Sequence, residues 1–115
     1  MTNIDWKQVP PVHFESWQTI FGNSEKGIDV EGLCPICGNQ KLHRWFMKGR
    51  PFEQIIEGNR FVAQGGLWEW CSSCGTFEHY SALVPDWWEC DLEVDLSNLR
   101  FTPEAIEEAR QKRFG

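Results

Sequence analysis

The sequence predicts a small α+β domain with antiparallel strands in the middle of the chain and a helix at its end. The chain has 115 residues, a length at which one hydrophobic core is the rule. Short aromatic and apolar stretches separated by turn-forming residues favour strands in the middle, and a proline followed by acidic residues near the end favours a helix. We therefore expect one domain over 1–115 with four segments: an N-terminal extension (1–33), a strand-rich core (34–84), an acidic strand (85–101) and a C-terminal helix (102–115).

The composition is that of a folded globular protein. Hydrophobic residues make up 41% of the chain and charged residues 24%, and 17 acidic against 11 basic side chains give a formal net charge of −6. The negative charge argues against a general affinity for nucleic acid or anionic lipid. No run approaches the roughly 20 apolar residues of a membrane-spanning helix, and the first residues show no secretion signal. We expect a cytoplasmic protein that does not enter a membrane.

The N-terminal extension carries one helical pattern and one short strand pattern. Phe14, Trp17 and Phe21 share one face at helical spacing, and Gly22 follows as a helix end. A strand over the same residues is the alternative. Residues 28–31 alternate between apolar and acidic side chains, which predicts a short strand leading into the core.

The core reads as β-structure interrupted by one loop. The predicted strands are 41–47, 60–63, 67–70 and 76–83. Residues 64–66, with the sequence Gln-Gly-Gly, predict a hairpin turn between the second and third of these strands. Residues 48–59 begin with the sequence Lys-Gly-Arg-Pro and end with Glu-Gly-Asn, and we expect a loop there with one helical turn at 52–56.

The last two segments follow different patterns. Between 90 and 96, apolar residues alternate with Asp91, Glu93 and Asp95, the period of a strand with one buried face. Thr102 and Pro103 then read as the cap and first residue of a helix over about 103–112. Because its apolar stripe is thin, we expect this helix to pack loosely.

Four cysteines form the strongest chemical pattern. They occur as two C-x-x-C-G motifs, Cys34 with Cys37 and Cys71 with Cys74. Each motif places two sulfurs on one side of a tight turn, and the glycine lets the backbone take a positive φ. Four thiolates form a closed tetrahedral site, so we expect one structural Zn²⁺ ion. Flanked by predicted strands, the two motifs resemble a zinc ribbon over about residues 33–83, a likeness that implies metal binding but no particular function.

Other interpretations of these cysteines remain open. The pairs could stay free of metal or form disulfides. The motif at Cys71 superficially resembles the thioredoxin redox motif, but a turn and strand follow it in place of the helix that redox chemistry needs. The paired motifs are also similar to those of rubredoxin, which implies iron, although here the proline lies in the first motif and the chain is far longer. We expect Cys90 to be a buried thiol, and His43 and His79 to be partly buried histidines. Metal ligation by one of these three is the alternative.

An acidic, tryptophan-containing segment is the candidate partner surface. Its residues are Asp86, Trp87, Trp88, Glu89, Asp91, Glu93 and Asp95. A row of carboxylates can steer a cationic partner, and one of the two adjacent tryptophans can serve as an exposed anchor. The alternative is a solvated strand face that discourages edge-to-edge aggregation.

A basic and aromatic strip over residues 41–50 gives the rival interpretation. It consists of Lys41, His43, Arg44, Trp45, Phe46, Lys48 and Arg50. Cations beside aromatic rings suit single-stranded nucleic acid, and zinc ribbons occur in transcription and RNA machinery. The strip therefore allows a nucleic-acid-binding protein as the second hypothesis.

No catalytic motif stands out, and we expect a protein that is not an enzyme. The leading hypothesis is a zinc-stabilised interaction module that binds a basic protein through the acidic segment. Small acidic proteins of this kind loosely resemble the immunity proteins that neutralise nuclease toxins, although no motif establishes that family. The remaining hypotheses are the nucleic-acid-binding zinc ribbon and a rubredoxin-like electron carrier.

Overall fold

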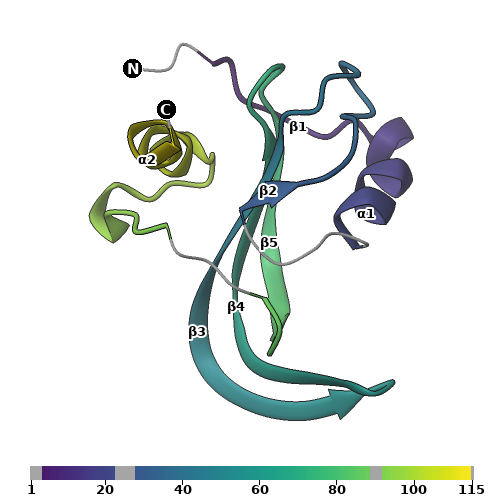
Figure 1. Ribbon diagram of the computed structural model, residues 1–115, viewed down its shortest axis with the longest axis vertical. Coiled ribbons are helices and arrows are strands. Elements are labelled where there is room, and N and C mark those ends of the chain that lie inside the picture. Colours follow the sequence, from purple (N-terminus) through teal and green to yellow (C-terminus); the bar gives the residue numbers. More distant parts are fainter. Residues whose placement is uncertain (1–3, 23–27, 89–91, 115) are drawn as a thin grey trace.

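A five-stranded sheet stands between two helices in the computed structural model, which describes residues 4–22, 28–88 and 92–114 (Figure 1). The strands are β1 (Lys7–Gln8), β2 (Asp29–Val30), β3 (Leu42–Ile56), β4 (Asn59–Cys71) and β5 (Thr76–Pro85). The helices are the 3₁₀ turns η1 (Pro11–His13) and η2 (Leu96–Asn98) and the α-helices α1 (Phe14–Gly22) and α2 (Glu104–Phe114). The predicted mixed α+β class and the C-terminal helix are confirmed.

The three long strands form an antiparallel meander. Across the sheet the order is β1-β5-β4-β3-β2, in which β1 runs parallel to β5 and every other neighbouring pair is antiparallel. The two edge strands cover only two residues each of their partners. The sheet is therefore built mainly by β3, β4 and β5.

The hairpin of β3 and β4 is longer than the sequence predicts. The predicted loop over 48–59 and its helical turn are wrong, because β3 continues to Ile56 and the chain reverses at Glu57 and Gly58, both with positive φ. The predicted turn at 64–66 is also wrong, since these residues lie inside β4. The two strands leave the body of the molecule together as a curved ribbon (Figure 1).

Glycines explain why the ribbon bends where a turn is predicted. The β3–β4 register shifts at Gly49, between Lys48 and Arg50, and a Cβ at Gly65 would overlap the carbonyl oxygen of Met47. At such a bulge the two backbones approach closely, which only glycine allows. The glycines at 65 and 66 therefore mark a bend in a continuous strand.

Alternate side chains of the sheet form two different cores. On the α1 face, Trp17 and Phe21 pack with Leu42 and with buried cysteines. On the α2 face, the cluster is mainly aromatic and consists of Ile28, Trp45, Trp68, Trp70, Phe77, Leu92 and Ile106. Farther along the α1 face, a third cluster of Phe46, Ala63, Leu67 and Val84 packs against Trp88. Most of the tryptophans therefore serve the core.

The predicted acidic strand at 90–96 is wrong over its described residues. Residues 92–95 have no regular structure and lead into η2, where Asp95 accepts hydrogen bonds from the N–H and hydroxyl of Ser97. Leu92 and Val94 pack into the α2-face core, so the alternation arises from an extended segment lying across that core. Residues 89–91 lie outside the described part of the chain.

Helix α2 packs more tightly than expected. Ile106 and Glu107 are both fully buried against the sheet. A buried carboxylate therefore packs beside the few apolar residues of the helix. The sequence pattern did not indicate this because a glutamate is normally expected at the surface. Among the described residues, no helix is long and apolar enough to cross a membrane.

Candidate metal centre

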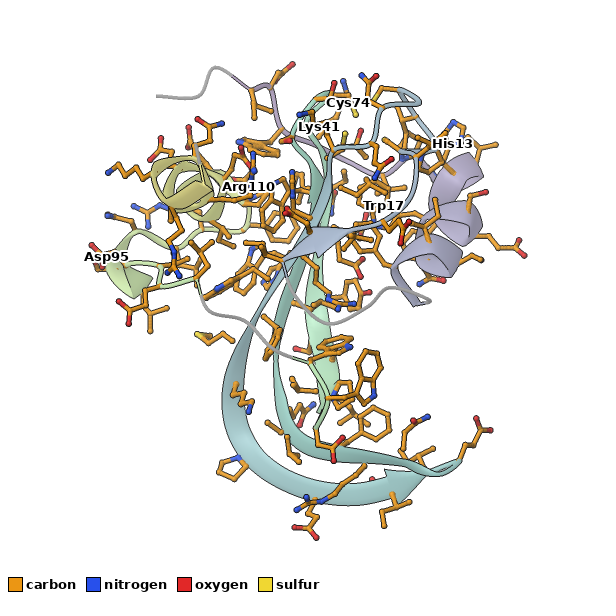
Figure 2. All side chains as sticks on the ribbon, in the orientation of Figure 1. His13, Trp17, Lys41, Cys74, Asp95 and Arg110 are labelled. Carbon is orange, nitrogen blue, oxygen red and sulfur yellow. The ribbon has the colours of Figure 1, made fainter. Side chains whose placement is uncertain are left out.

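The two cysteine motifs meet at the end of the sheet opposite the hairpin turn. The first motif precedes β3, and the second begins at the last residue of β4 and continues into the connection to β5. They are brought together because Leu42, at the start of β3, pairs with Cys71, at the end of β4. Figure 2 shows Cys74 beside Lys41 at this end of the molecule.

Each motif forms the same tight turn, referred to here as a knuckle. In the first knuckle the N–H of Gly38 donates to the carbonyl of Cys34 at 2.8 Å, and in the second the N–H of Gly75 donates to the carbonyl of Cys71 at 3.0 Å. Both glycines have positive φ, 78° and 81°. The glycine after each cysteine pair therefore has the role that the sequence predicts.

The four sulfurs form one cluster, and two of the separations between them match those of a tetrahedral thiolate site. The Sγ atoms of Cys34 and Cys74 lie 3.8 Å apart and those of Cys37 and Cys71 lie 3.7 Å apart, and all four lie within 4.8 Å of one another. Four sulfurs bound at about 2.3 Å to one ion would lie about 3.8 Å apart, because a tetrahedron's edge is about 1.63 times its centre-to-vertex distance. The two short separations match this value and the others do not exceed 4.8 Å, so the four sulfurs are close enough together to hold one metal ion.

Burial and backbone N–H groups set the charge state of the thiols in opposite directions. Burial raises the pKa of Cys34 and Cys71, while the N–H groups two and three residues later in each knuckle favour the thiolate. At Cys37 the effect of burial is outweighed, because hydrogen bonds from the N–H of Asn39 and from neighbouring cysteines lower its pKa to about 7. A bound cation favours the thiolate form of all four ligands.

The inner side of the site faces the apolar core, and on its outer side a hydrogen bond connects the two knuckles. Cys34 and Cys71 are buried in the α1-face core beside Trp17 and Leu42. Between the knuckles, the side-chain amide of Asn39 donates to the hydroxyl of Ser73 at 2.7 Å. The metal site is thus part of the core on one side and close to the surface on the other.

The other candidate ligands in the described chain have different partners. His43 Nδ1 lies 2.9 Å from the Asp29 carboxylate and its Nε2 lies 2.9 Å from the hydroxyl of Ser72. His79 stacks on Trp68 with ring centroids 3.9 Å apart, and its Nδ1 lies 3.0 Å from the carbonyl oxygen of Leu67. Neither histidine belongs to the sulfur cluster. Cys90 lies outside the described residues.

The predicted partner surface is only partly a surface. Trp87 is 42% exposed, and Asp86 beside it is exposed. Trp88 instead packs on Phe46, and the Arg44 guanidinium lies 4.1 Å above its ring. Of the two adjacent tryptophans, Trp87 is therefore the exposed one and Trp88 is half-buried.

The described residues of the predicted acidic row, Glu93 and Asp95, do not lie on a strand. Glu93 and Asp95 are exposed, but they lie in an irregular segment and so lack the regular spacing of a strand. Glu93 borders a surface hollow shared with Lys112 and Arg113 of α2, and Asp95 caps η2. Glu89 and Asp91 lie outside the described residues.

The basic and aromatic strip is largely buried. Exposed fractions are 4% at His43, 2% at Arg44, 5% at Trp45 and 8% at Phe46. Lys41, Lys48 and Arg50 are exposed at the two ends of the strip. The aromatic rings that would stack on bases are therefore buried, while three of the four cations lie at the surface.

Sequence reasoning missed two buried carboxylates. Glu69 accepts hydrogen bonds from the indole of Trp17 and the hydroxyl of Tyr80, both at 3.1 Å. Glu107 accepts one from the indole of Trp70 at 2.8 Å and a bidentate pair from Arg110. The tryptophans that donate to these carboxylates lie far away in the chain, so no local sequence pattern marks the pairs. The abundance of tryptophan, whose N–H needs an acceptor, was the available signal.

Comparison with protein-family models, with curated proteins and with solved structures finds no match to this chain. The candidate metal centre therefore rests on the four cysteines and their geometry.

Proposed function

We propose that this chain is a zinc-stabilised, non-catalytic interaction module of the cytoplasm, which binds a basic protein partner through a surface centred on Trp87. The observation that carries the proposal is the meeting of the Cys34, Cys37, Cys71 and Cys74 sulfurs within 4.8 Å of one another, with two of the separations at 3.8 and 3.7 Å. A four-thiolate site leaves no coordination position for substrate, so the metal has a structural role and recognition falls to the protein surface.

Zinc is the proposed ion because it suits a closed set of four thiolates and carries no redox function. Iron in the same set is the rubredoxin-like alternative, and it would make the protein an electron carrier. Both ions fit the sulfur spacing, so the colour and metal content of the purified protein decide between them.

The surface around Trp87 supports recognition of another protein. Its indole packs edge-on against Trp88 with ring centroids 6.1 Å apart, and Trp88 is itself held on Phe46. The N–H of Asp86 donates to the carbonyl of Arg60 at 2.9 Å, which ties this turn to the β3–β4 ribbon. A large aromatic side chain held on a fixed support loses little entropy when a partner covers it.

The negative charge of the chain favours a basic partner. The chain has a net charge of −6, and Asp86 lies next to the exposed indole. An acidic surface speeds encounter with a basic partner and discriminates against acidic ones. An inhibitor that covers a basic enzyme surface, as immunity proteins do, fits this description. An adaptor subunit that binds a basic protein fits it equally well.

Metal analysis tests the first half of the proposal. Protein purified under reducing conditions is expected to be colourless and to contain one equivalent of zinc. A red protein with one equivalent of iron would replace the proposal with the electron carrier, and metal-free folded protein would overturn it.

Titration of a captured partner tests the second half. The chain serves as bait, and the captured protein is purified and titrated against wild type, Trp87→Ala and Val12→Ala, the last being a control at a residue 82% exposed on η1. The tryptophan variant is expected to raise Kd about 30-fold, the effect of a hot spot of about 2 kcal/mol, while the control binds as wild type. Equal binding by all three proteins, or capture of nucleic acid alone, contradicts the proposed surface.

A further inference from the structure

Three side chains form a continuous hydrogen-bonded chain next to the metal centre. Asp29 on β2 lies 2.9 Å from Nδ1 of His43 on β3, and Nε2 of His43 lies 2.9 Å from the hydroxyl of Ser72. Ser72 lies within the second knuckle, directly after Cys71. The chain therefore connects an edge strand to the segment between two proposed metal ligands.

Hydrogen-bonding capacity assigns the direction of the chain. Burial and the nearby Arg110 guanidinium lower the pKa of His43, which favours the neutral imidazole. An ionised carboxylate can only accept, so Nδ1–H donates to Asp29 and Nε2 accepts from the Ser72 hydroxyl. The Ser72 hydroxyl then has the His43 Nε2 as its nearer acceptor at 2.9 Å and the carbonyl oxygen of Lys41 as a more distant one at 3.4 Å.

The same order of groups occurs in serine hydrolases, but the local backbone points to another use. A serine nucleophile needs N–H groups that face the developing oxyanion. Here the N–H groups of Ser73 and Cys74 are directed at the Cys71 sulfur, and the N–H of Ser72 donates to the carbonyl of Lys41 at 2.9 Å. These donors are arranged for a thiolate and for strand pairing.

The two serines of the second knuckle are held from different sides. The Ser72 hydroxyl contacts His43, whereas the Ser73 hydroxyl accepts from Asn39 of the first knuckle. His43 itself is only 4% exposed and lies beside Trp70, with ring centroids 5.5 Å apart. Because hydrogen bonds hold both nitrogens of this buried imidazole, its ring has one orientation. Its bond to Ser72 therefore holds the second knuckle in one position.

We propose that Asp29, His43 and Ser72 are positioning residues that hold the second knuckle in its metal-binding geometry, an inference that rests on the proposed zinc site. In the metal-free chain they keep Cys71 and Cys74 facing the first knuckle. Zinc then binds with less reordering of the backbone, and outer hydrogen bonds of this kind change metal affinity by about 10–100-fold.

Zinc competition against a chromogenic chelator tests the proposal. Ser72→Ala is expected to weaken zinc binding about 10–100-fold, and Ser72→Thr, which keeps the hydroxyl, is expected to restore most of the affinity. Ser81→Ala, at an exposed serine of β5, is the matched control and binds as wild type. Loss of affinity that threonine does not restore, or unchanged affinity in the alanine variant, overturns the positioning role.

A double-mutant cycle separates a connected chain from independent effects. His43→Gln and Ser72→Ala in one protein are expected to weaken zinc binding no further than the worse single variant, since they remove the same hydrogen bond. Additive losses overturn the chain. His79→Gln, at the imidazole stacked on Trp68 of the same sheet face, is the control for replacing a histidine.

Two further measurements keep the result interpretable. If His43→Gln does not fold, Asp29→Ala at the exposed end of the chain replaces it in the cycle. Labelling of Ser72 by a fluorophosphonate would show a nucleophile and would overturn the assignment. Failure of wild type to bind zinc refutes the proposed function, whereas tight zinc binding by wild type and Ser72→Ala alike refutes this inference alone.

Discussion

The indole Nε1 of Trp70 lies 2.8 Å from a carboxylate oxygen of Glu107. Trp70 directly precedes the metal-site residue Cys71, and Glu107 is a fully buried residue of α2. The C-terminal helix is therefore bonded to the strand end that carries the second knuckle. Arg110 completes the arrangement through two hydrogen bonds of 2.8 Å to the same carboxylate.

Glu107→Ala is expected to destabilise the fold by at least about 2 kcal/mol, because it leaves the buried Trp70 N–H without its acceptor and the Arg110 guanidinium without its counter-ion. Chemical denaturation with zinc present measures the loss. Glu104→Ala changes an exposed glutamate of the same helix and is the matched control. Similar losses in the two variants would show that the helix responds to carboxylate removal in general and not to this contact.

Removal of the metal is expected to abolish cooperative unfolding. Structural zinc contributes about 10–16 kcal/mol in small finger peptides, whereas a whole domain is typically stable by about 5–15 kcal/mol. Cys74→Ser should therefore lose the zinc equivalent and the sharp thermal transition, as should wild type treated with a strong chelator. Cys90→Ser, outside the four-cysteine set, should retain both, and a native melting curve for the Cys74 variant would refute the structural role.

Stability is expected to depend on pH through Glu69. Burial raises the pKa of this carboxyl to about 7, against an ordinary value near 4.5, despite hydrogen bonds from Trp17 and Tyr80. Between these two values the folded state holds a proton that the unfolded state has released, so the free energy of unfolding falls as pH rises.

Glu69→Gln removes this titration. Relative to the variant, wild type is expected to lose about 3 kcal/mol between pH values near 5 and 8, as measured by denaturation at saturating zinc. Glu31→Gln, at an exposed glutamate, is the control and should follow the wild-type curve. Parallel curves for wild type and Glu69→Gln would show that Glu69 does not titrate differently in the two states.

Gly65→Ala is expected to destabilise the protein by about 1–3 kcal/mol. The added Cβ would overlap the carbonyl oxygen of Met47. The backbones of β3 and β4 could relieve this overlap only by moving apart at the bend. Gly22→Ala, where a Cβ would meet nothing within 4 Å, is the control and should be neutral or slightly stabilising at the end of α1. Comparison of the two thermal midpoints decides, and equal midpoints would show that the ribbon does not need its glycine.

Local patterns in the sequence correctly predicted those elements whose structure depends on neighbouring residues. The two C-x-x-C-G motifs, the apolar spacing of Phe14, Trp17 and Phe21, and the acidic start of α2 all predicted structures that are present. Each depends on residues within a few positions of one another.

The wrong predictions concern segments whose structure depends on contacts between residues far apart in the chain. Pro51 and Gly49 argued for a loop, yet β3 continues through both, with Pro51 paired to Ala63 of β4 and Gly49 at a shift in the register. The alternation from 90 to 96 was interpreted as a strand, although the apolar residues Leu92 and Val94 are buried against the α2-face core without strand pairing. Arg44 was assigned to a surface because of its charge, but it is buried across from Glu69, its partner in the β3–β4 register.

The meeting of Leu42 and Cys71 beside the sulfurs has a consequence for the hairpin as a whole. A slip of β3 by one residue against β4 would turn each β3 side chain to the opposite face of the sheet, which would carry Arg44 into the aromatic core and Trp45 out of it. The proposed ion, held by the cysteines that precede β3 and by those at and after the end of β4, would fix the alignment of the two strands at the end opposite the turn. Metal binding would then select one pairing of the long strands, and with it the side chains that each helix meets.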